Sequence, residues 1–236
     1  MRRRRHDLGP AATLAVLALG AVTGCGEPAQ GPRDPRECPP DPAWTTLLDG
    51  SPSSVEAWEQ AGPGGFERLD DGTLLSTGGL GLLWHPSPLD LPYLAEVEWS
   101  VAGDDNSGVF VGFPDPAGDP VVAVDAGYEV QIDASDAPER TTGGLYGVRG
   151  PDLGARDDAL QPPGEWNTFE VEVRADRVTV RLNGSQVVDH AVDASRPVAD
   201  PGHLGLQNHG DGDDVRFRSV RVRPLATTSV PGCSSS

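Results

Sequence analysis

Short segments in which hydrophobic and polar residues alternate recur along the chain and predict β-strands. Residues 169–174 read Phe-Glu-Val-Glu-Val-Arg, and residues 178–182 alternate again after a tight turn at Ala175-Asp176. Such a period of two places one side of each strand toward a core and the other toward solvent. Asn183-Gly184 then supplies the residue pair typical of a two-residue hairpin turn. The pattern therefore predicts antiparallel strands joined by hairpins.

The predicted strands are separated by turns rich in glycine and proline, and helical patterns are scarce. The predicted strands are Leu74–Ser76, Leu94–Val101, Gly108–Phe113, Val121–Val124, Tyr128–Asp133, Gly144–Val148, Thr168–Arg174, Arg177–Leu182, Gln186–Asp189, Leu204–Gln207 and Val215–Val222. The 30 glycines and 23 prolines break these strands apart. Many short strands without helices favour an all-β sandwich of two antiparallel sheets over an α/β fold.

The N-terminus has the pattern of a bacterial lipoprotein signal. Arg2–Arg5 precede an apolar run from Ala11 to Val22 that is too short to span a membrane. Val22-Thr23-Gly24-Cys25 matches the lipobox, in which cleavage leaves a lipidated cysteine. The sequence predicts a signal peptide at residues 1–24, lipidation of Cys25, and an exported protein. A plain secretory signal is the alternative.

Three further segments follow the signal. Residues 25–43 are rich in Pro, Gly and charge and predict a flexible tether. Residues 44–225 have the length of one large sandwich without an internal linker, and residues 226–236 form a polar tail. We expect a monomer in the cell envelope, anchored by its lipid alone to the outer face of the cytoplasmic membrane or to another envelope membrane.

Charge and cysteine content limit the partners and the compartment. The 36 acidic residues exceed the 18 basic ones and give a net charge of −18, which disfavours nucleic acid as a partner. Cys38 and Cys233 lie near opposite ends of the domain in an oxidising compartment, so we expect them to form a disulfide. Two free thiols are the alternative.

One predicted strand combines an apolar side with a row of polar groups. In residues 127–133, Gly-Tyr-Glu-Val-Gln-Ile-Asp, the period of two puts Glu129, Gln131 and Asp133 on one face and the apolar residues on the other. Carboxyl and amide groups aligned in this way are typical of a site for a polar ligand such as a carbohydrate. A solvated strand face is the alternative.

A set of ordered motifs resembles the 3-keto-disaccharide hydrolase domain family. The motifs are Thr46-Leu47-Leu48-Asp49-Gly50, Asn106-Ser107-Gly108-Val109-Phe110, Gly127-Tyr128-Glu129-Val130-Gln131-Ile132, Gly144-Leu145-Tyr146-Gly147, Pro163-Gly164-Glu165-Trp166-Asn167-Thr168, Leu182-Asn183-Gly184 and Gly205-Leu206-Gln207-Asn208-His209-Gly210. The resemblance implies a concanavalin-like jelly roll and cleavage of a glycosidic bond in a sugar already oxidised at C3. A base removes the C2 hydrogen that the ketone acidifies, the aglycone leaves C1, and water adds back.

The residues expected to carry this chemistry lie on the polar strand and near the motif glycines. The candidate catalytic residues are Glu129, Asp133 and His209, and the candidate substrate-binding residues are Gln131, Asn106, Tyr146, Gln207 and His85. A histidine is suited to proton abstraction near neutral pH. His209 as a turn residue, and Asn106-Ser107-Gly108 as a simple turn, are the alternatives. A lipid-anchored lectin-like module that binds glycans without cleaving them is the alternative function.

No motif for a dinucleotide, a phosphate-binding loop or a paired-cysteine metal site occurs in the sequence. The aspartates at 211, 213 and 214 offer oxygen ligands for a divalent cation such as calcium, but they lack the regular spacing of a calcium loop. A turn is the preferred interpretation, and no cofactor is predicted with certainty.

Overall fold

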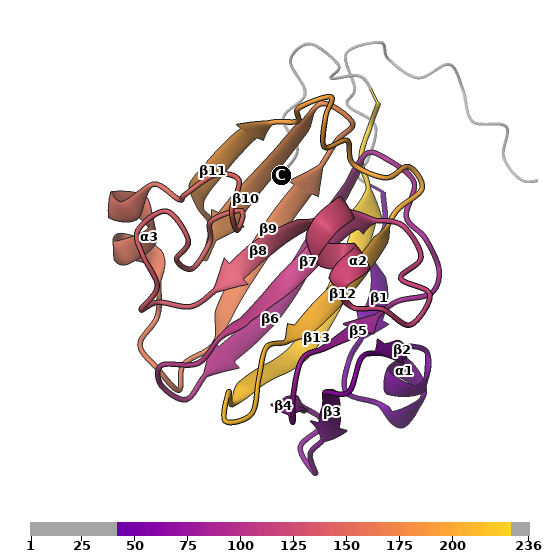
Figure 1. Ribbon diagram of the computed structural model, residues 1–236, viewed down its shortest axis with the longest axis vertical. Helices are drawn as coiled ribbons and strands as arrows, with labels where there is room; N and C mark the ends of the chain where they lie inside the picture. The colour runs from indigo at the N-terminus through magenta and orange to yellow at the C-terminus, as the bar shows by residue number, and fades with distance from the viewer. Residues whose placement is uncertain (1–41, 228–236) are drawn as a thin grey trace, which may run out of the picture. The chain divides into compact units, whose positions relative to one another are not determined.

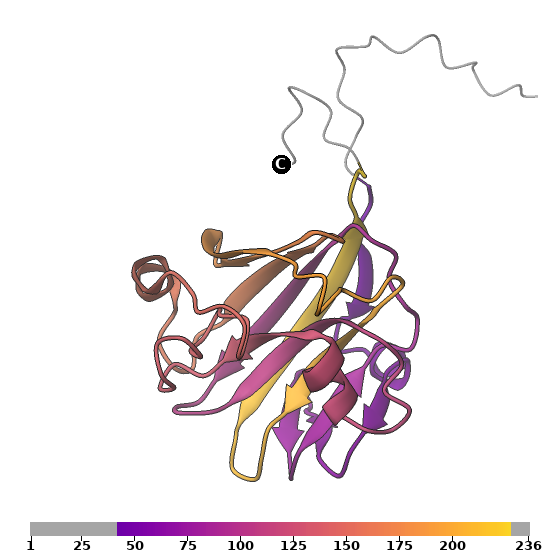
Figure 2. The ribbon, with the colours of Figure 1, turned by 45° about the horizontal axis from the view of Figure 1, so that its top comes forward.

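Residues 42–227, which the computed structural model describes, form two antiparallel β-sheets packed face to face (Figures 1 and 2). The larger sheet has eight strands, in the order β11 (Ser185–Ala191), β10 (Arg177–Leu182), β9 (Asn167–Val173), β6 (Tyr93–Val101), β13 (Val215–Pro224), β4 (Leu74–Thr77) and β3 (Gly65–Arg68), with β1 (Thr45–Leu48) paired to β13. The smaller has five, in the order β2 (Glu59–Ala61), β5 (Gly81–Trp84), β12 (His203–Asn208), β7 (Ser107–Phe113) and β8 (Tyr128–Ile132). The predicted all-β sandwich is confirmed.

Three short helices connect the strands: α1 (Pro52–Glu56), α2 (Val121–Ala126) and α3 (Leu153–Ala159). Helix α2 lies across the outer face of the smaller sheet, and α3 lies beside β11 at the edge of the larger one (Figure 1). Within the described part of the chain, no helix has the length and apolar character needed to cross a membrane.

The core lies between the two sheets and follows from the alternation in the sequence. In β9, Phe169, Val171 and Val173 point inward and are fully buried. The ring of Phe169 packs against that of Trp99 from β6, with 5.0 Å between the ring centroids. The inward side chains of the smaller sheet meet them in the same apolar cluster. Burial of this apolar area supplies the main favourable free energy of folding.

The hairpin between β10 and β11 has the turn that its sequence predicts. Asn183 and Gly184 have φ angles of 49° and 85°. Positive φ at both central residues is the requirement of a type I′ turn, whose twist matches that of the flanking strands. The backbone N–H of Asn183 also donates to the carbonyl of Thr168, which joins this turn to β9.

The predicted strand at Val121–Val124 is wrong, because these residues form helix α2. Its β-branched residues favour a strand, but Asp119-Pro120 begins a helix here. The backbone of Pro120 is already helical, and the Asp119 carboxylate accepts a hydrogen bond from the Val121 N–H. Gly127 ends the helix. The local start and stop residues therefore outweigh the strand propensity of the short apolar run.

The predicted strand at Gly144–Val148 is also wrong. The segment turns, with Leu145 forming isolated bridges to Val130 and Arg149. Gly143 and Gly147 have φ angles of 84° and 67°, which extended backbone does not allow. Strands β1, β2, β3 and β5 were not predicted. The signal, Cys25, Cys38, Cys233 and most of the tether and tail lie outside the described residues, so these predictions stay untested.

Asn208 joins the two sheets at one end of the sandwich. It is the last residue of β12 in the smaller sheet and is fully buried. Its side-chain amide donates to the carbonyl of Gly65 in β3, at 2.9 Å, and to the carbonyl of Thr77 in β4. Both acceptors belong to the larger sheet, so this one buried amide links the two sheets by two hydrogen bonds.

Replacing Asn208 by Leu should lower the free energy of unfolding by about 1 to 3 kcal/mol, because the two hydrogen bonds that join the sheets are lost. Urea denaturation measures the change. The same replacement at exposed Gln186 is the control and should change the value by less than about 0.5 kcal/mol. Equal stability of the Asn208→Leu protein and the wild type would show that this contact does not hold the sheets together.

Candidate functional site

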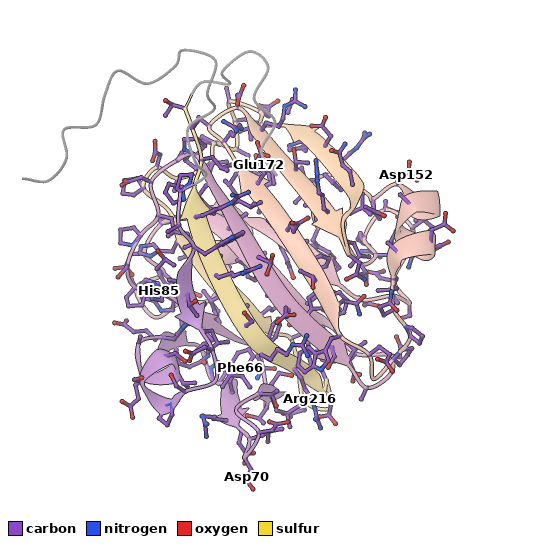
Figure 3. All side chains as sticks on the ribbon, turned by 180° about the vertical axis from the view of Figure 1, so that it is seen from behind. Phe66, Asp70, His85, Asp152, Glu172 and Arg216 are labelled. Atoms are coloured by element: carbon purple, nitrogen blue, oxygen red, sulfur yellow. The ribbon has the colours of Figure 1, made fainter. Side chains whose placement is uncertain are left out.

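The outer face of the larger sheet carries charges that are already paired. Arg221 contacts Glu96 at 2.6 Å, and Arg218 contacts Glu98 at 2.8 Å. Figure 3 shows this face with Glu172 toward one end and Arg216 toward the other. A pocket of about 320 Å³ lies among Glu170, Glu172, Arg181 and their neighbours. Paired, partly exposed charges of this kind are typical of a solvated sheet face.

The outer face of the smaller sheet has an apolar part and a polar part. The apolar part lies next to α2 and consists of Ala61, Leu82, Trp84, Phe110, Phe113 and Ala123. The polar part contains Glu129 and Gln131 from β8 and Gln207 from β12, with Asn106, Asp133 and His209 where the strands begin or have ended. We call these six residues the polar patch.

Strand β8 presents the polar residues as the alternation predicts. Tyr128, Val130 and Ile132 belong to the core between the sheets, so Glu129 and Gln131 face outward. Both outward side chains are nevertheless buried, with 6% of Glu129 and 1% of Gln131 exposed. The alternative of a solvated strand face is therefore wrong for these two residues, and the two polar groups lie in a largely water-free environment.

The sheet register aligns Gln131 and Gln207 on either side of Gly108. Gln131 lies opposite Gly108 of β7. On the other side of β7, Leu206 lies opposite Val109, so the next residue, Gln207, comes opposite Gly108. The Ser107 hydroxyl donates to the Gln207 carbonyl at 2.7 Å and fixes this register. The two amides and the glycine thus form one row across three strands.

The carboxyl group of Glu129 lies over Gly108 in this row. A Cβ atom built on Gly108 would lie 2.4 Å from Oε1 of Glu129 and 2.7 Å from its Cγ. These distances are shorter than any van der Waals contact, so only glycine leaves room for the carboxyl group. The bare backbone of Gly108 is thus approached by a side chain of the protein itself.

Burial raises the pKa of the Glu129 carboxyl from 4.5 to about 8. Hydrogen bonding from Gln207 and the positive charge of Arg196 act in the opposite direction and offset part of this effect. The Arg196 guanidinium is held by the carbonyls of Gly127 and Val124. At neutral pH Glu129 is therefore mostly a neutral carboxylic acid, a form that can donate a proton.

Two amide oxygens of the polar patch lack a donor. Oε1 of Gln131 and Oε1 of Gln207 are buried and have no hydrogen-bond partner among the described residues. A buried acceptor without a donor costs free energy and is unusual in a folded protein. Ligand hydroxyl groups, or a protonated neighbour, would supply the missing donors.

A chain of hydrogen bonds links the other three residues of the patch. His209 Nδ1 lies 2.9 Å from Oδ2 of Asp213, and the other oxygen of Asp213 accepts from the Asn106 N–H at 3.0 Å. The Asn106 side-chain amide donates to Asp133 at 3.0 Å. The His209 side chain remains 51% exposed, so its second ring nitrogen is within reach of a ligand.

Asp133 has both carboxylate oxygens occupied. Oδ1 accepts hydrogen bonds from the N–H groups of Ser135 and Asp136 and from the Ser135 hydroxyl, while Oδ2 accepts from Asn106. This pattern closes a turn after β8 and holds the Asn106 side chain. The carboxylate is thus an orienting group in the structure, with little capacity left for a substrate.

Tyr146 and His85 occupy different positions relative to the patch. The Tyr146 N–H donates to the Glu129 carbonyl, and the Leu145–Val130 bridge puts Tyr146 opposite Glu129 on the same outer face. Its side chain is 37% exposed. His85 follows the other end of β5 and lines a separate pocket of about 480 Å³ with Thr45, Leu89 and Tyr93. The structure therefore does not bring His85 to the patch.

A family model, described as a 3-keto-alpha-glucoside-1,2-lyase-like domain, matches residues 43–223. The chain belongs to this family. The match covers the whole sandwich, and with it every residue of the polar patch. No curated protein matches the chain.

Solved structures of low sequence identity share the fold. A provisionally named glycosyl hydrolase from Parabacteroides distasonis has a TM-score of 0.64 and 19% identity, over 78% of this chain and 94% of that one. A Bacillus subtilis protein of galectin-like fold has a TM-score of 0.52 and 16% identity, over 78% and 96%. A Bauhinia forficata lectin solved with GalNAc has a TM-score of 0.55 and 16% identity, over 79% and 100%. These likenesses confirm the jelly-roll sandwich.

The structure adds two residues to the site of this family member that the sequence did not single out. The sequence assigned Asp213 to a turn or to a cation, but its position four residues after His209 allows the contact that orients the imidazole. Arg196 comes from the loop after β11, and no local pattern connects it to Glu129. In the described region, no group of three or more His, Cys, Asp or Glu side chains has an arrangement that could hold a metal ion.

The raised pKa of Glu129 should make the protein less stable as the pH rises. The folded state binds the Glu129 proton more tightly than the unfolded state, so this stabilisation is complete below about pH 4.5 and is lost between pH 4.5 and 8. The loss amounts to about 4 to 5 kcal/mol. Urea denaturation at pH 5 and pH 8.5 should show a smaller decline for Glu129→Gln than for the wild type. The Glu165→Gln protein, altered at an exposed residue, should retain the wild-type decline. An equal decline in all three proteins would contradict the raised pKa of Glu129.

Proposed function

We propose that this protein cleaves the glycosidic bond of 3-keto glycosides by base-assisted elimination, followed by addition of water. The observation that carries the proposal is the presence of two unlike groups in the polar patch: a buried neutral acid, Glu129, within the smaller sheet, and an exposed imidazole at the sheet's edge, His209, which Asp213 orients. The family description supports the choice of substrate.

His209 is assigned as the base. With Nδ1 donating its proton to Asp213, the free nitrogen Nε2 is the acceptor. A ketone at C3 acidifies the hydrogen on C2, and Nε2 removes that proton while the electron pair moves into a C3 enolate. The base needs access to a bound sugar, and the exposed position of His209 provides it.

Glu129 is assigned as the acid. As the enolate collapses, a C1–C2 double bond forms, the bond from C1 to the glycosidic oxygen breaks, and Glu129 gives its proton to the leaving oxygen. Water then adds at C1, its proton returns to the Glu129 carboxylate, and the imidazolium returns the proton to C2. Both groups regain their starting states, and the products are the aglycone alcohol and a 3-keto sugar.

Gln131 is assigned to polarise the C3 carbonyl, because its amide is not used in the turn network. Asn106, the other candidate for this role, already gives its side-chain amide to Asp133. Amide donors aimed at a developing oxyanion stabilise an enolate without a change of charge in the protein. Asp133 is assigned to orientation rather than to proton transfer, because both its oxygens are occupied.

A lectin-like protein that binds a glycan without cleaving it is the second candidate. The unpartnered amide oxygens of Gln131 and Gln207 suit sugar hydroxyl donors, and Tyr146 offers an exposed ring beside them. Binding of a saccharide with no release of product would favour this candidate. Export with lipid attachment at Cys25 completes the proposal, so that the substrate would be met outside the cytoplasm.

Glu129→Gln and His209→Ala should each slow turnover of a 3-keto-glucoside with an alkyl aglycone by at least about a hundredfold. A nitrophenyl aglycone needs no acid, so Glu129→Gln should recover most of its rate on that substrate, whereas His209→Ala should not. Asp211→Asn changes an exposed residue of the same loop and is the control for folding and charge. Wild-type rates in both site variants would refute the mechanism.

A further inference from the structure

We infer that Gln131 and Gln207 form an amide cradle across Gly108, which holds the Glu129 side chain as a neutral carboxylic acid aimed at the leaving group. This inference rests on the proposed function and adds to it. The two glutamines position the acid, and the second amide N–H of Gln131 is left for the C3 carbonyl. It differs from the sequence-based expectation, in which both amides bind the substrate alone.

The first argument is the geometry of the row. Gln131 and Gln207 lie opposite Gly108 on its two sides, and the Glu129 carboxyl occupies the space above Gly108 that any other residue would fill with a side chain. The carboxyl group thus lies between two primary amides. Gln131 and Gln207 are themselves 1% and 7% exposed, so water has little access to the row.

The second argument is the balance of donors and acceptors. Oε1 of Gln131 and Oε1 of Gln207 are buried acceptors without a donor. An ionised Glu129 would bring two further acceptors and no donor, whereas a neutral one brings an O–H group. A carboxylic acid and a primary amide are complementary, because the acid O–H can donate to the amide oxygen while the amide N–H donates to the acid carbonyl. Only the neutral acid therefore satisfies one of the orphan oxygens without a ligand.

The surrounding charges do not reverse this preference. Arg196 is the one described residue whose charge acts on Glu129, and it favours the carboxylate, as does the hydrogen bond from Gln207. Other titratable or charged groups on adjoining elements are Asp125, Asp133, Tyr146, Arg149, His203 and His209. Burial outweighs the two effects that favour ionisation, and the pKa of Glu129 remains raised. The Glu129 carboxyl therefore keeps its proton at neutral pH.

The direct test is a carboxyl carbon NMR titration of the ligand-free protein labelled at glutamate, with Glu129→Gln to identify the resonance. We expect Glu129 to titrate near pH 8 rather than near 4.5. A wild-type resonance that titrates near 4.5 would overturn the inference. The titration is measured on the wild-type protein without substrate, and the variant serves only to identify the resonance.

Gly108→Ala tests the cradle itself. The new Cβ would displace the carboxyl from the row into water, and its pKa should fall toward 4.5. At pH 7 the protonated fraction would then drop from about nine tenths to about 0.3%, so turnover of an alkyl 3-keto-glucoside should fall roughly 300-fold. The upper limit of the pH–rate profile should move to lower pH with it. Loss of structure alone would lower the rate without moving this limit.

Gly103→Ala is the matched control, because a Cβ at Gly103 meets no atom within 4 Å. It should keep the wild-type pH profile and the wild-type Glu129 titration. A folded Gly108→Ala protein with an unchanged titration would contradict the cradle. A neutral Glu129 in a protein that turns over no 3-keto glycoside would instead leave the cradle standing and refute the proposed function.

Discussion

The site is organised around a carboxyl group that the fold keeps away from water. Glu129 projects from a strand whose other side lies in the core, and its carboxyl rests on the bare backbone of Gly108. Ionisation in such surroundings is costly, so the group keeps its proton. The adjacent glutamines provide amide contacts without adding charge. A side chain at Gly108 would occupy the space of the Glu129 carboxyl, so this carboxyl could neither be buried there nor lie close to Gln207.

The division of the smaller sheet's outer face explains how a buried acid and an accessible base coexist. Helix α2 and the apolar residues beneath it cover one part of the face. Toward the start of β7, the strands give way to turns whose side chains hydrogen-bond to one another, from His209 through Asp213 and Asn106 to Asp133. This network orients an imidazole that remains exposed. Glu129 is protected within the sheet, whereas His209 lies in a loop at its edge.

Local sequence patterns predicted the strands of the fold well, but they did not predict the surroundings of Glu129. Alternation identified β8 and β9 with their correct faces, and Asn183-Gly184 identified its turn, because these signals act between neighbours in sequence. The predicted strands at Val121–Val124 and Gly144–Val148 are wrong because Pro120 starts a helix in one case and glycines with positive φ turn the chain in the other. These backbone effects outweigh the strand propensity of the residues. The burial of Glu129 could not be read from β8 alone. It depends on Gly108, Gln207 and Arg196, which only the tertiary fold brings beside it.

The disposition of carboxyl groups favours elimination over ordinary retaining hydrolysis. A retaining glycosidase needs two carboxyl groups about 5 Å apart, one of them ionised and free to attack the sugar. Along β8 the position between Glu129 and Asp133 is Gln131, which cannot ionise, and Asp133 is engaged by four hydrogen bonds. Glu129 is therefore left as the one carboxyl group of this strand available for proton transfer, and it is neutral. The proposed elimination needs one acid, one base and an oxyanion donor, and these residues can provide them. In that proposal the C3 ketone of the substrate would provide the activation that a nucleophilic carboxylate provides in a retaining glycosidase.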